Sequence, residues 1–313
     1  MELSAPKYYS KFQCVADRCT HSCCVGWEID IDAATLAYYR SLPDELGAAI
    51  CKGIAEDEAG AHFALCANGR CPNLDARGLC RIISALGEEA LCDICREHPR
   101  FYHRVGNRLE CGLGASCEEA ARLILAEEDY ASLLPVGDAD GQQNEQAASD
   151  FDVIARRAAV FSILSDHSRS YEERLRLIEV HHAVPLKMDE ERLRALLDSL
   201  EYLNEQHRAQ LLDCCGEDSV PHGDAALACE RFLAYLIYRH ASKERTEAGF
   251  RLAVGVALVM ERLFRCMLCR QGISCIESAV TVSEELEYSE DNTDAIRFAL
   301  ESELPGIESR PQA

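Results

Sequence analysis

The sequence lacks the features that would place it in a membrane, export it or bind it to nucleic acid. Its longest apolar run, residues 252–260, has nine residues, whereas a helix needs about 20 to span a bilayer. The amino-terminal segment has no apolar core typical of a signal peptide. The formal net charge is −22, and a surface of that sign repels phosphate backbones. We therefore expect a cytoplasmic protein that binds neither membranes nor nucleic acid.

The glycine signature of dinucleotide-binding folds is also missing. No G-x-G-x-x-G turn follows a predicted strand, and the nearest stretch, residues 112–115, lacks the third glycine. This absence disfavours a Rossmann-type domain. At 48% hydrophobic and 27% charged residues, the chain can nevertheless bury a core and is not disordered.

Cysteine is what the sequence has in excess, with eighteen residues, twelve of them before residue 118. In the densest group, Cys14, Cys19, Cys23 and Cys24, four thiols fall within eleven residues. Clustered thiols without an export signal are usually metal ligands, and four thiolates can bind zinc or an iron–sulfur cluster. Adjacent Cys23 and Cys24 would point about 100° apart on a helix, so we do not expect both to bind one ion. The pattern leaves open two sites, or one cluster with thiols that line it.

Six later cysteines fall in stretches with helical periodicity. There a buried thiol behaves as a small hydrophobic group, and we expect core positions rather than ligands. These residues are Cys214, Cys215, Cys229, Cys266, Cys269 and Cys275.

The chain divides by pattern into two parts of a mainly α fold. Residues 1–134 read as a cysteine-rich module with little β structure, held together by a metal or cluster. Residues 135–150 form a polar linker. Helical periodicity then dominates residues 151–305, which we predict to be an all-helical domain. Residues 306–313 are expected to be a loose tail.

Local patterns predict individual elements of the first part. Residues 28–32 alternate like a strand, although Asp32 can instead cap a helix over 33–41. Ser116, with Glu119 three residues on, resembles a capping box for a helix to residue 128. We also predict helices over 44–58 and 87–95, a strand over 108–112, and a hairpin pairing 63–65 with 79–83.

The second part is predicted to consist of successive helices. They cover residues 151–167, 171–182, 189–204, 206–215, 225–241 and 245–271, with two shorter ones over 283–286 and 291–303.

Four motif-bearing stretches together resemble the flagellin lysine-N-methylase family. They are F-x-C-x4-C-x3-C-C-x-G-W at residues 12–27, R-C-P-N-L-D-x3-L-C-R-I at 70–82, L-C-D-I-C-R-E-H-P-R at 91–100, and S-C-E-E-A-A-R-L-I-L at 116–125. That family contains a cysteine-rich module similar to zinc- or iron-chelating proteins. The resemblance covers about residues 12–125, with a weaker signature at residues 287–292. One departure is Glu118, where the family pattern has proline.

The resemblance implies methyl transfer from S-adenosylmethionine to lysine side chains of flagellin, or of another lysine-rich surface protein. It also implies a bound [4Fe–4S] cluster, with zinc as the alternative. The cysteines that match the family pattern are Cys14, Cys19, Cys23, Cys24, Cys71, Cys80, Cys95 and Cys117. Four others fall outside it: Cys51, Cys66, Cys92 and Cys111.

Methyl transfer to an amine needs a neutral lysine held in line with the sulfonium methyl group. The C-x3-C-x2-C spacing associated with radical S-adenosylmethionine enzymes is absent, so we expect polar displacement. Candidate cofactor-binding residues are Trp27, Arg100 and Tyr102, with His103 beside them. Trp27 could instead cover the metal site, and Arg100 could form a salt bridge or helix C-cap. No catalytic residue is assigned.

Two other functions fit the same residues. A non-enzymatic metal-binding or electron-transfer module would explain the thiols beyond eight. A zinc-stapled scaffold could bind a basic partner through its acidic helical part. Whichever function applies, we expect a monomer.

Overall fold

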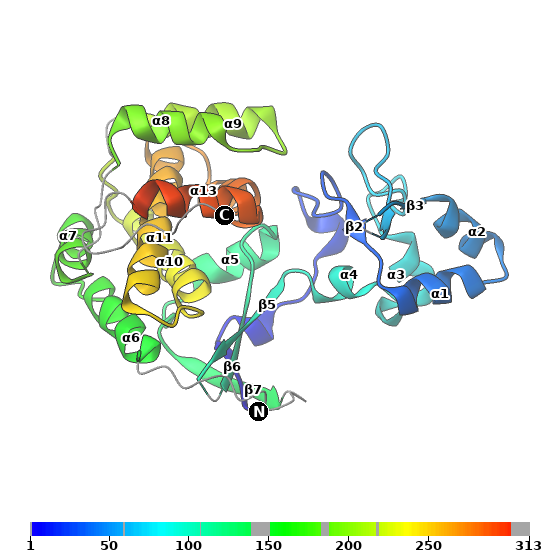
Figure 1. The fold of residues 1–313 in the computed structure, drawn as a ribbon, viewed down its shortest axis with the longest axis horizontal. Coiled ribbons are helices and arrows are strands. Elements are labelled where there is room, and N and C mark those ends of the chain that lie inside the picture. Colours follow the sequence, from blue (N-terminus) through cyan, green and yellow to red (C-terminus); the bar gives the residue numbers. More distant parts are fainter. Residues whose placement is uncertain are drawn as a thin grey trace. The chain divides into compact units, whose positions relative to one another are not determined.

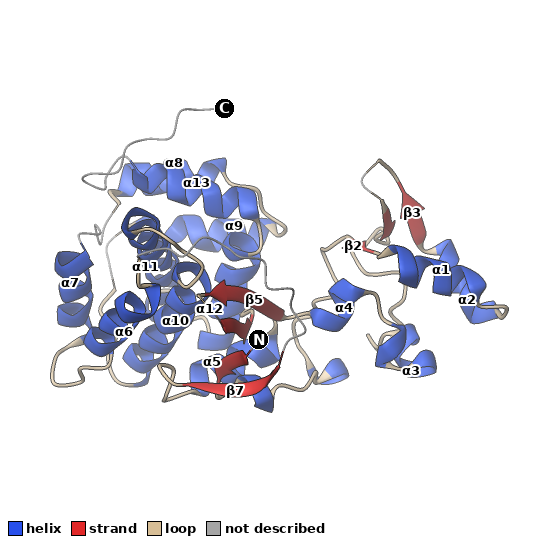
Figure 2. Cartoon of the chain, turned by 60° about the horizontal axis from the view of Figure 1, so that its bottom comes forward, coloured by secondary structure: helices blue, strands red, loops and turns tan. Residues whose placement is uncertain are grey.

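The computed structural model describes residues 2–58, 60–106, 108–138, 151–182, 188–216 and 219–301. The chain folds into two compact units, each made from separate stretches of sequence. The cysteine-rich unit consists of Gln13–Phe101 and Cys117–Glu119. The helical unit consists of Met1–Phe12, Tyr102–Ser116 and Ala120–Ala313. Figures 1 and 2 show their elements.

Short elements make up the cysteine-rich unit. A three-stranded antiparallel sheet has the order β2-β4-β3. Its strands are β2 (Ile29–Asp30), β3 (Ile54–Glu56) and β4 (Ala61–Phe63). The helices are η2 (Ala16–Arg18), α1 (Ala33–Ser41), α2 (Glu45–Lys52), α3 (Arg81–Leu86), η3 (Glu88–Ala90) and α4 (Asp93–Glu97).

A small core around Tyr39 joins these elements. The Tyr39 ring is fully buried and lies 6.1 Å, between ring centroids, from Phe63 of β4. Its hydroxyl donates a 2.7 Å hydrogen bond to the carbonyl of Ala90. Ile50 and Ile82 fill the same core. One α helix, a sheet strand and the chain before α4 are thereby fixed together.

The helical unit contains a four-stranded sheet of order β5-β6-β1-β7. β1 pairs in parallel with β6 and antiparallel with β7. The strands are β1 (Glu2–Pro6), β5 (Arg100–Val105, which begins in the cysteine-rich unit), β6 (Arg108–Leu113) and β7 (Leu133–Asp138).

Helices form the rest of this unit, with α10 and α11 packed side by side at its centre (Figure 1). Between them, the rings of Phe232 and Phe264 stack at 4.5 Å between centroids. The helices are η1 (Tyr9–Lys11), α5 (Glu118–Ala126), α6 (Val153–Leu164), α7 (Tyr171–His182), α8 (Glu190–Ser199), α9 (Glu205–Leu212), η4 (Asp213–Cys215), α10 (Asp224–Ala241), α11 (Glu247–Cys269), α12 (Cys275–Val282), the π-helix η5 (Ser283–Glu287) and α13 (Glu290–Glu301). In the described chain, no helix has the length and apolarity needed to cross a bilayer.

The mainly α prediction is confirmed, but the structure has more β structure than expected. β1, β5 and β7 were not predicted, and residues 135–138 of the predicted linker belong to β7. The rest of that linker, from residue 139, and the predicted tail lie outside the described residues.

Several local predictions were wrong for identifiable reasons. The helix expected over 44–58 ends at Lys52, where Gly53 forms the C-cap, and β3 follows. The segment 79–83 starts α3 instead of pairing with 63–65. The helix expected over 87–95 is broken into η3 and α4. The capping box at Ser116 does not form, because α5 begins at Glu118 and the buried Ser116 hydroxyl has no hydrogen-bond partner.

Candidate functional site

The first group of thiols lies where the carboxyl-terminal piece of the cysteine-rich unit meets its first loop. Cys117 is buried, and the neighbouring Glu118 carboxylate accepts hydrogen bonds from the Thr20 amide at 2.7 Å and the His21 amide at 2.8 Å. Thr20 Oγ1 adds a third bond at 2.9 Å. Glu118 therefore holds the 19–23 loop against Cys117. Glutamate at this position, the departure from the family pattern, has a defined structural role.

The pKa values of the thiols around Cys117 are shifted by burial and by one another. Burial raises the pKa of Cys19 to about 12, and the neighbouring Cys117, Glu118 and Cys14 add to the shift. Cys117 and Cys14 also help to raise the pKa of Cys23. We call Cys14, Cys19, Cys23 and Cys117 the first thiol set.

A second group forms where the 66–80 loops fold back on Cys24. The amide of Cys71 donates a 2.8 Å hydrogen bond to the carbonyl of Cys24, and the amide of Gly26 donates one of 2.8 Å to the carbonyl of Gly69. A β-bridge joins Leu74 to Cys80 across the next turn. These loops have little regular secondary structure, but their backbone hydrogen bonds determine where each thiol lies.

Helix α4 adds two more thiols to this group. Cys92 is its N-cap residue and is fully buried, and Cys95 lies one turn on. Cys71, Cys80 and Cys95 all pack against the same core as Cys92. We call Cys24, Cys71, Cys80 and Cys95 the second thiol set, with Cys92 beside it.

The pKa values of the second set are also raised by burial and by neighbouring thiols. Burial raises the pKa of Cys71 to about 11, and Cys24 and Cys80 contribute to the shift. A hydrogen bond with Cys92 raises the pKa of Cys95, which Cys24 and Cys71 raise further. Thiols that raise one another's pKa cannot all ionise together unless a cation offsets the repulsion. Metal binding would supply such a cation, but among the described residues no three thiols bring their sulfur atoms within 4.8 Å of one another.

Cys23 and Cys24 stand at the boundary between the sets. They lie in a turn, not on a helix, so the 100° separation expected from helix geometry does not apply to them. The two side chains are hydrogen-bonded to each other, which raises the pKa of Cys23. The same bond, with the Arg70 guanidinium nearby, lowers the pKa of Cys24.

The cysteines outside the family pattern have different surroundings. The Cys51 thiol donates to the Tyr39 carbonyl at 3.6 Å, and Cys66 is exposed in a turn. Cys111 is buried on β6 in the helical unit. The sequence analysis placed Cys92 outside the family pattern of ligands, yet its side chain is hydrogen-bonded to that of Cys95. The spacing Cys92-x2-Cys95 was the sequence signal for this proximity.

The six later cysteines only partly follow expectation. Cys214, Cys215, Cys229 and Cys266 are buried as predicted, and no disulfide joins any of the eighteen cysteines. Cys269 is exposed and Cys275 is partly exposed, so the core assignment was wrong for these two. Both lie at helix ends, where periodicity indicates a buried face least reliably.

The candidate cofactor residues are divided between the units. Trp27 is half-buried just after the Cys23–Cys24 turn of the cysteine-rich unit. Arg100 donates a 3.3 Å hydrogen bond to the carbonyl of Arg96 in α4, the C-cap arrangement considered as its alternative. Tyr102 is 43% exposed on β5. His103 follows it in the helical unit, where burial lowers its pKa to about 4 and keeps the imidazole neutral at physiological pH.

The helical unit contains buried charged networks that the sequence analysis did not predict. Glu287 of the π-helix is the centre of one of them. Its carboxylate accepts hydrogen bonds from Tyr235 at 2.7 Å and Ser283 at 2.6 Å, and pairs with Arg239 and His240. Burial would raise the pKa of Glu287, but Arg239 and these partners lower it to about 2. Every oxygen is engaged, so Glu287 organises the interior as an anion.

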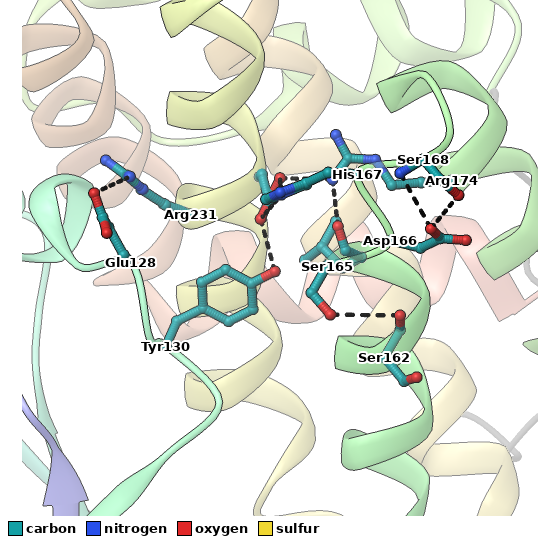
Figure 3. Close-up of polar contacts among 11 residues, drawn as sticks. Glu128, Tyr130, Ser162, Ser165, Asp166, His167, Ser168, Arg174 and Arg231 are labelled. Atoms are coloured by element: carbon teal, nitrogen blue, oxygen red, sulfur yellow. Dashed lines mark hydrogen bonds and ion pairs between the residues drawn. The ribbon is translucent and has the colours of Figure 1, made fainter.

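Glu230 of α10 is the centre of a second network. Its carboxylate contacts the hydroxyl of Tyr130 at 2.8 Å, Nε2 of His167 at 2.9 Å and Nη1 of Arg174 at 2.6 Å (Figure 3). A third buried group is the ion pair between Glu110 and Arg157. It is bidentate, with Nη1 and Nη2 of Arg157 donating to the two carboxylate oxygens at 2.5 and 2.9 Å. In the sequence the charged residues of these networks look like ordinary surface groups, and only the folded structure shows that Glu110, Arg157, Arg174 and Glu230 are buried.

A further group of potential ligands lies beside the π-helix. His207, Glu284 and Glu285 place one ligand atom each within 4.8 Å of one another. Within the group, His207 Nδ1 hydrogen-bonds to Glu285 at 2.8 Å, and the Leu203 amide donates to the same carboxylate at 2.8 Å. These hydrogen bonds already account for the arrangement.

Comparison with known proteins places the chain among relatives. No protein-family model matches it, and no solved structure matches it. It is 30% identical over 141 residues, 42% of the chain, to the flagellar biosynthetic protein FliU of Salmonella muenchen, of which the match covers 81%. The same identity and length relate it to the lysine-N-methylases of Salmonella typhimurium and Salmonella choleraesuis. The match covers 34% of each of these two longer proteins. The chain therefore belongs to the family of FliU and these lysine-N-methylases, the flagellin lysine-N-methylase family that its cysteine motifs resemble.

Proposed function

We propose that this protein is a protein-lysine N-methyltransferase that transfers methyl groups from S-adenosylmethionine to lysine side chains of flagellin or of another lysine-rich surface protein. The observation that carries the proposal is the 30% identity over 141 residues to proteins named lysine-N-methylase. The match spans about a third of those proteins' length, so the activity comes to this chain as a proposal. The ordered thiol sets support it because they lie within the motifs that resemble the family.

The transfer breaks the bond between the methyl carbon and the sulfonium sulfur and forms one between that carbon and the lysine nitrogen. The nitrogen must first lose its proton, because the ammonium form has no electron pair to donate. The cationic cofactor becomes neutral S-adenosylhomocysteine, and the methylated amine takes up the positive charge. The chain must therefore exclude water from the amine and align it with the methyl group.

Three residues remain our candidates for binding the cofactor. Trp27 can stack on the adenine or face the sulfonium, because an aromatic face attracts a cation. Arg100 can pair with the cofactor carboxylate, and Tyr102 is exposed enough to contact a ligand. The net charge of −22 would attract a lysine-rich substrate over distance.

Cysteines of the two thiol sets would hold an iron–sulfur cluster, with zinc as the alternative. When bound, the group would supply a rigid support for the cofactor-binding part of the chain. Trp27 lies three residues after the Cys23–Cys24 pair in the same segment of the chain, so a group held there would be close to it along the chain.

The test is transfer of label from S-adenosylmethionine carrying an isotopic methyl group. The protein is purified without oxygen, reconstituted with iron and sulfide, and incubated with flagellin. We expect label on lysine residues by peptide mass spectrometry, and none on flagellin whose lysines have been acetylated. Absence of label from a reconstituted protein that binds the cofactor would contradict the proposal. A zinc protein that retains flagellin but transfers no label would favour the scaffold function.

A further inference from the structure

We propose that Cys214 and Cys266 form an oxidation site in the helical unit, at which a small hydroperoxide joins the two thiols in a reversible disulfide and Arg270 activates Cys266. The inference goes beyond the proposed function and does not rest on it. Both cysteines belong to the group that the sequence analysis assigned to the core, and both are buried.

Two separate elements bring these thiols together. Cys214 lies in η4, and Cys266 lies in the last turn of α11. The Sγ atom of Cys214 lies 3.7 Å from the carbonyl oxygen of Leu263, which is three residues before Cys266 and in the same turn of that helix. The side chains of Cys214 and Cys266 are hydrogen-bonded to each other. A disulfide would therefore form between groups that are already in contact.

Nitrogen donors surround the pair. Nε2 of Gln271 donates to Sγ of Cys214 at 3.4 Å. Nη1 of Arg270 donates to Sγ of Cys266 at 4.0 Å, and the same nitrogen would lie 3.2 Å from a Cβ atom at Gly216. The guanidinium thus reaches from the end of α11 to the end of η4. A thiol that only fills the core needs apolar neighbours, whereas each of these two has a polar partner.

These contacts favour a thiolate at Cys266 and a protonated thiol at Cys214. The hydrogen bond from Cys214 lowers the pKa of Cys266 to about 7, and Arg270 adds to this shift. The same bond, together with burial, raises the pKa of Cys214. The thiolate is the reactive form of cysteine, and a second thiol in contact with it can complete a disulfide.

Depth in the fold determines which oxidant fits. Cys214 is 1% exposed and Cys266 is 4% exposed, but the neighbouring Cys269, Arg270 and Gly272 are at the surface. A molecule as small as hydrogen peroxide can pass between such side chains, whereas a bulky disulfide such as oxidised glutathione cannot. The oxidant is therefore a small hydroperoxide.

The reaction balances with hydrogen peroxide as the only oxidant. The Cys266 thiolate attacks one peroxide oxygen, so an S–O bond forms, the O–O bond breaks, and the released hydroxide takes up a proton from solvent. The Cys214 sulfur then attacks the sulfenic acid, so the S–S bond forms and the S–O bond breaks. The proton of Cys214 leaves with this second hydroxide as water. Two thiols are oxidised to one disulfide, and the peroxide is reduced to two molecules of water.

Two nearby cysteines serve as controls. Cys215 follows Cys214 directly, but the charged groups that act on its burial-raised pKa include Arg194 and Glu190 of α8. Cys269 is exposed, three residues after Cys266 on the same helix. Neither is expected to join the disulfide.

The experiment treats the full chain, purified without oxygen, with hydrogen peroxide, blocks the remaining thiols by alkylation and digests the protein without reductant. We expect mass spectrometry to show the peptides of Cys214 and Cys266 joined and lighter than their sum by two hydrogen atoms. A reductant should separate them and restore both thiols. Absence of this cross-link in the wild-type chain would overturn the proposal, and that result needs no variant to fold.

Single variants then assign the sulfur atoms. They are needed because Cys214, Cys215 and Cys229 share one tryptic peptide, and Cys266 and Cys269 share another. C214S and C266S should each lose the cross-link, whereas C215S, C229S and C269S should keep it. A cross-link that survives in C214S or in C266S would overturn the proposal.

Replacement of Arg270 tests the activation of Cys266. R270Q removes the cation beside the sulfur and should slow formation of the cross-link severalfold, whereas R270K keeps the charge and should react at a rate closer to wild type. Equal rates in wild type and R270Q would overturn the assignment of Arg270 as the activating group.

Discussion

At the scale of the residue, Glu287 shows how a weak sequence signature can mark a structural centre. The signature at residues 287–292 is not specific, yet its first residue is the buried carboxylate that joins Arg239, Tyr235 and Ser283. The π-helix places it there. π-helices are rare and tend to occur at functional positions, and no periodicity in the sequence predicts one.

Replacement of Glu287 by glutamine should destabilise the helical unit by about 3–5 kcal/mol, because it leaves the buried Arg239 without its carboxylate. Urea unfolding of E287Q at neutral pH would measure the loss. E290Q is the matched control, since Glu290 is exposed on α13 close by, and it should change stability by less than about 0.5 kcal/mol.

The stability difference between E287Q and wild type should depend on pH in a defined direction. The folded-state pKa of Glu287 is about 2, below its ordinary value. The stabilisation, on the order of 3 kcal/mol, is therefore complete above about pH 4.5 and is lost as the pH falls towards 2. A difference that stays constant between pH 5 and pH 3 would show that Glu287 is not an ionised partner of Arg239.

Gly114 is a second residue whose role only the structure explains. A Cβ atom here would overlap the Tyr288 hydroxyl and lie 2.8 Å from Nη1 of Arg239. We expect G114A to cost about 1–3 kcal/mol from overpacking. In G114A/Y288F the clashing hydroxyl is gone, so part of that loss should be recovered. Equal thermal stabilities of G114A and wild type would contradict this.

At the scale of the element, one of the two helix caps predicted from the sequence is confirmed. Asp32 does cap α1, as its side chain accepts from the Thr35 amide at 2.9 Å. It also accepts from the Asp93 amide at 3.1 Å, at the first residue of α4. That second bond links segments sixty-one residues apart, and no local pattern contains such information.

Replacement of Asp32 by alanine should therefore cost more than replacement of an ordinary cap. Asp44 is the matched control, because it caps α2 alone through the Gly47 amide at 2.8 Å. We expect about 2 kcal/mol for D32A and about 1 kcal/mol for D44A in chemical unfolding of the cysteine-rich unit. Similar losses in both variants would mean that the bond to Asp93 contributes nothing.

The sheets were the part of the fold that the sequence predicted least. β1 pairs with β6, more than a hundred residues later, through Leu3–Leu109 and Ser4–Glu110. Alternation over residues 28–32 did predict β2, but a strand of three residues such as β3 is too short for alternation to be recognised. Long helices such as α11 were predicted closely because many residues contribute to their period.

At the scale of the whole molecule, the two units differ in what stabilises them. The cysteine-rich unit has α helices of nine residues or fewer and one small core, so metal–thiolate bonds would supply much of its stability. The helical unit has the 23-residue α11 and a large apolar core. The sequence indicated that the cysteines are ligands and that the chain resembles a family. Which thiols are neighbours required the fold, since Cys14 and Cys117 are 103 residues apart.

Removal of metal should consequently unfold one unit and spare the other. After treatment with a chelator and reductant, amide hydrogen exchange should accelerate throughout residues 13–101 and change little in α10 and α11. Addition of metal should restore protection. Uniform loss of protection along the chain, or none, would contradict the assignment of the metal to the cysteine-rich unit.

The most direct measurement of the central claim is the metal and acid-labile sulfide content of the protein purified without oxygen, together with its visible absorption. The account predicts bound metal. If the cysteines hold a [4Fe–4S] cluster, iron and sulfide should be present in equal amounts and the protein should be brown. Zinc without sulfide would mean that the cysteines bind zinc and not an iron–sulfur cluster. A colourless protein with neither metal, whose eighteen thiols all react with a thiol reagent, would contradict the account.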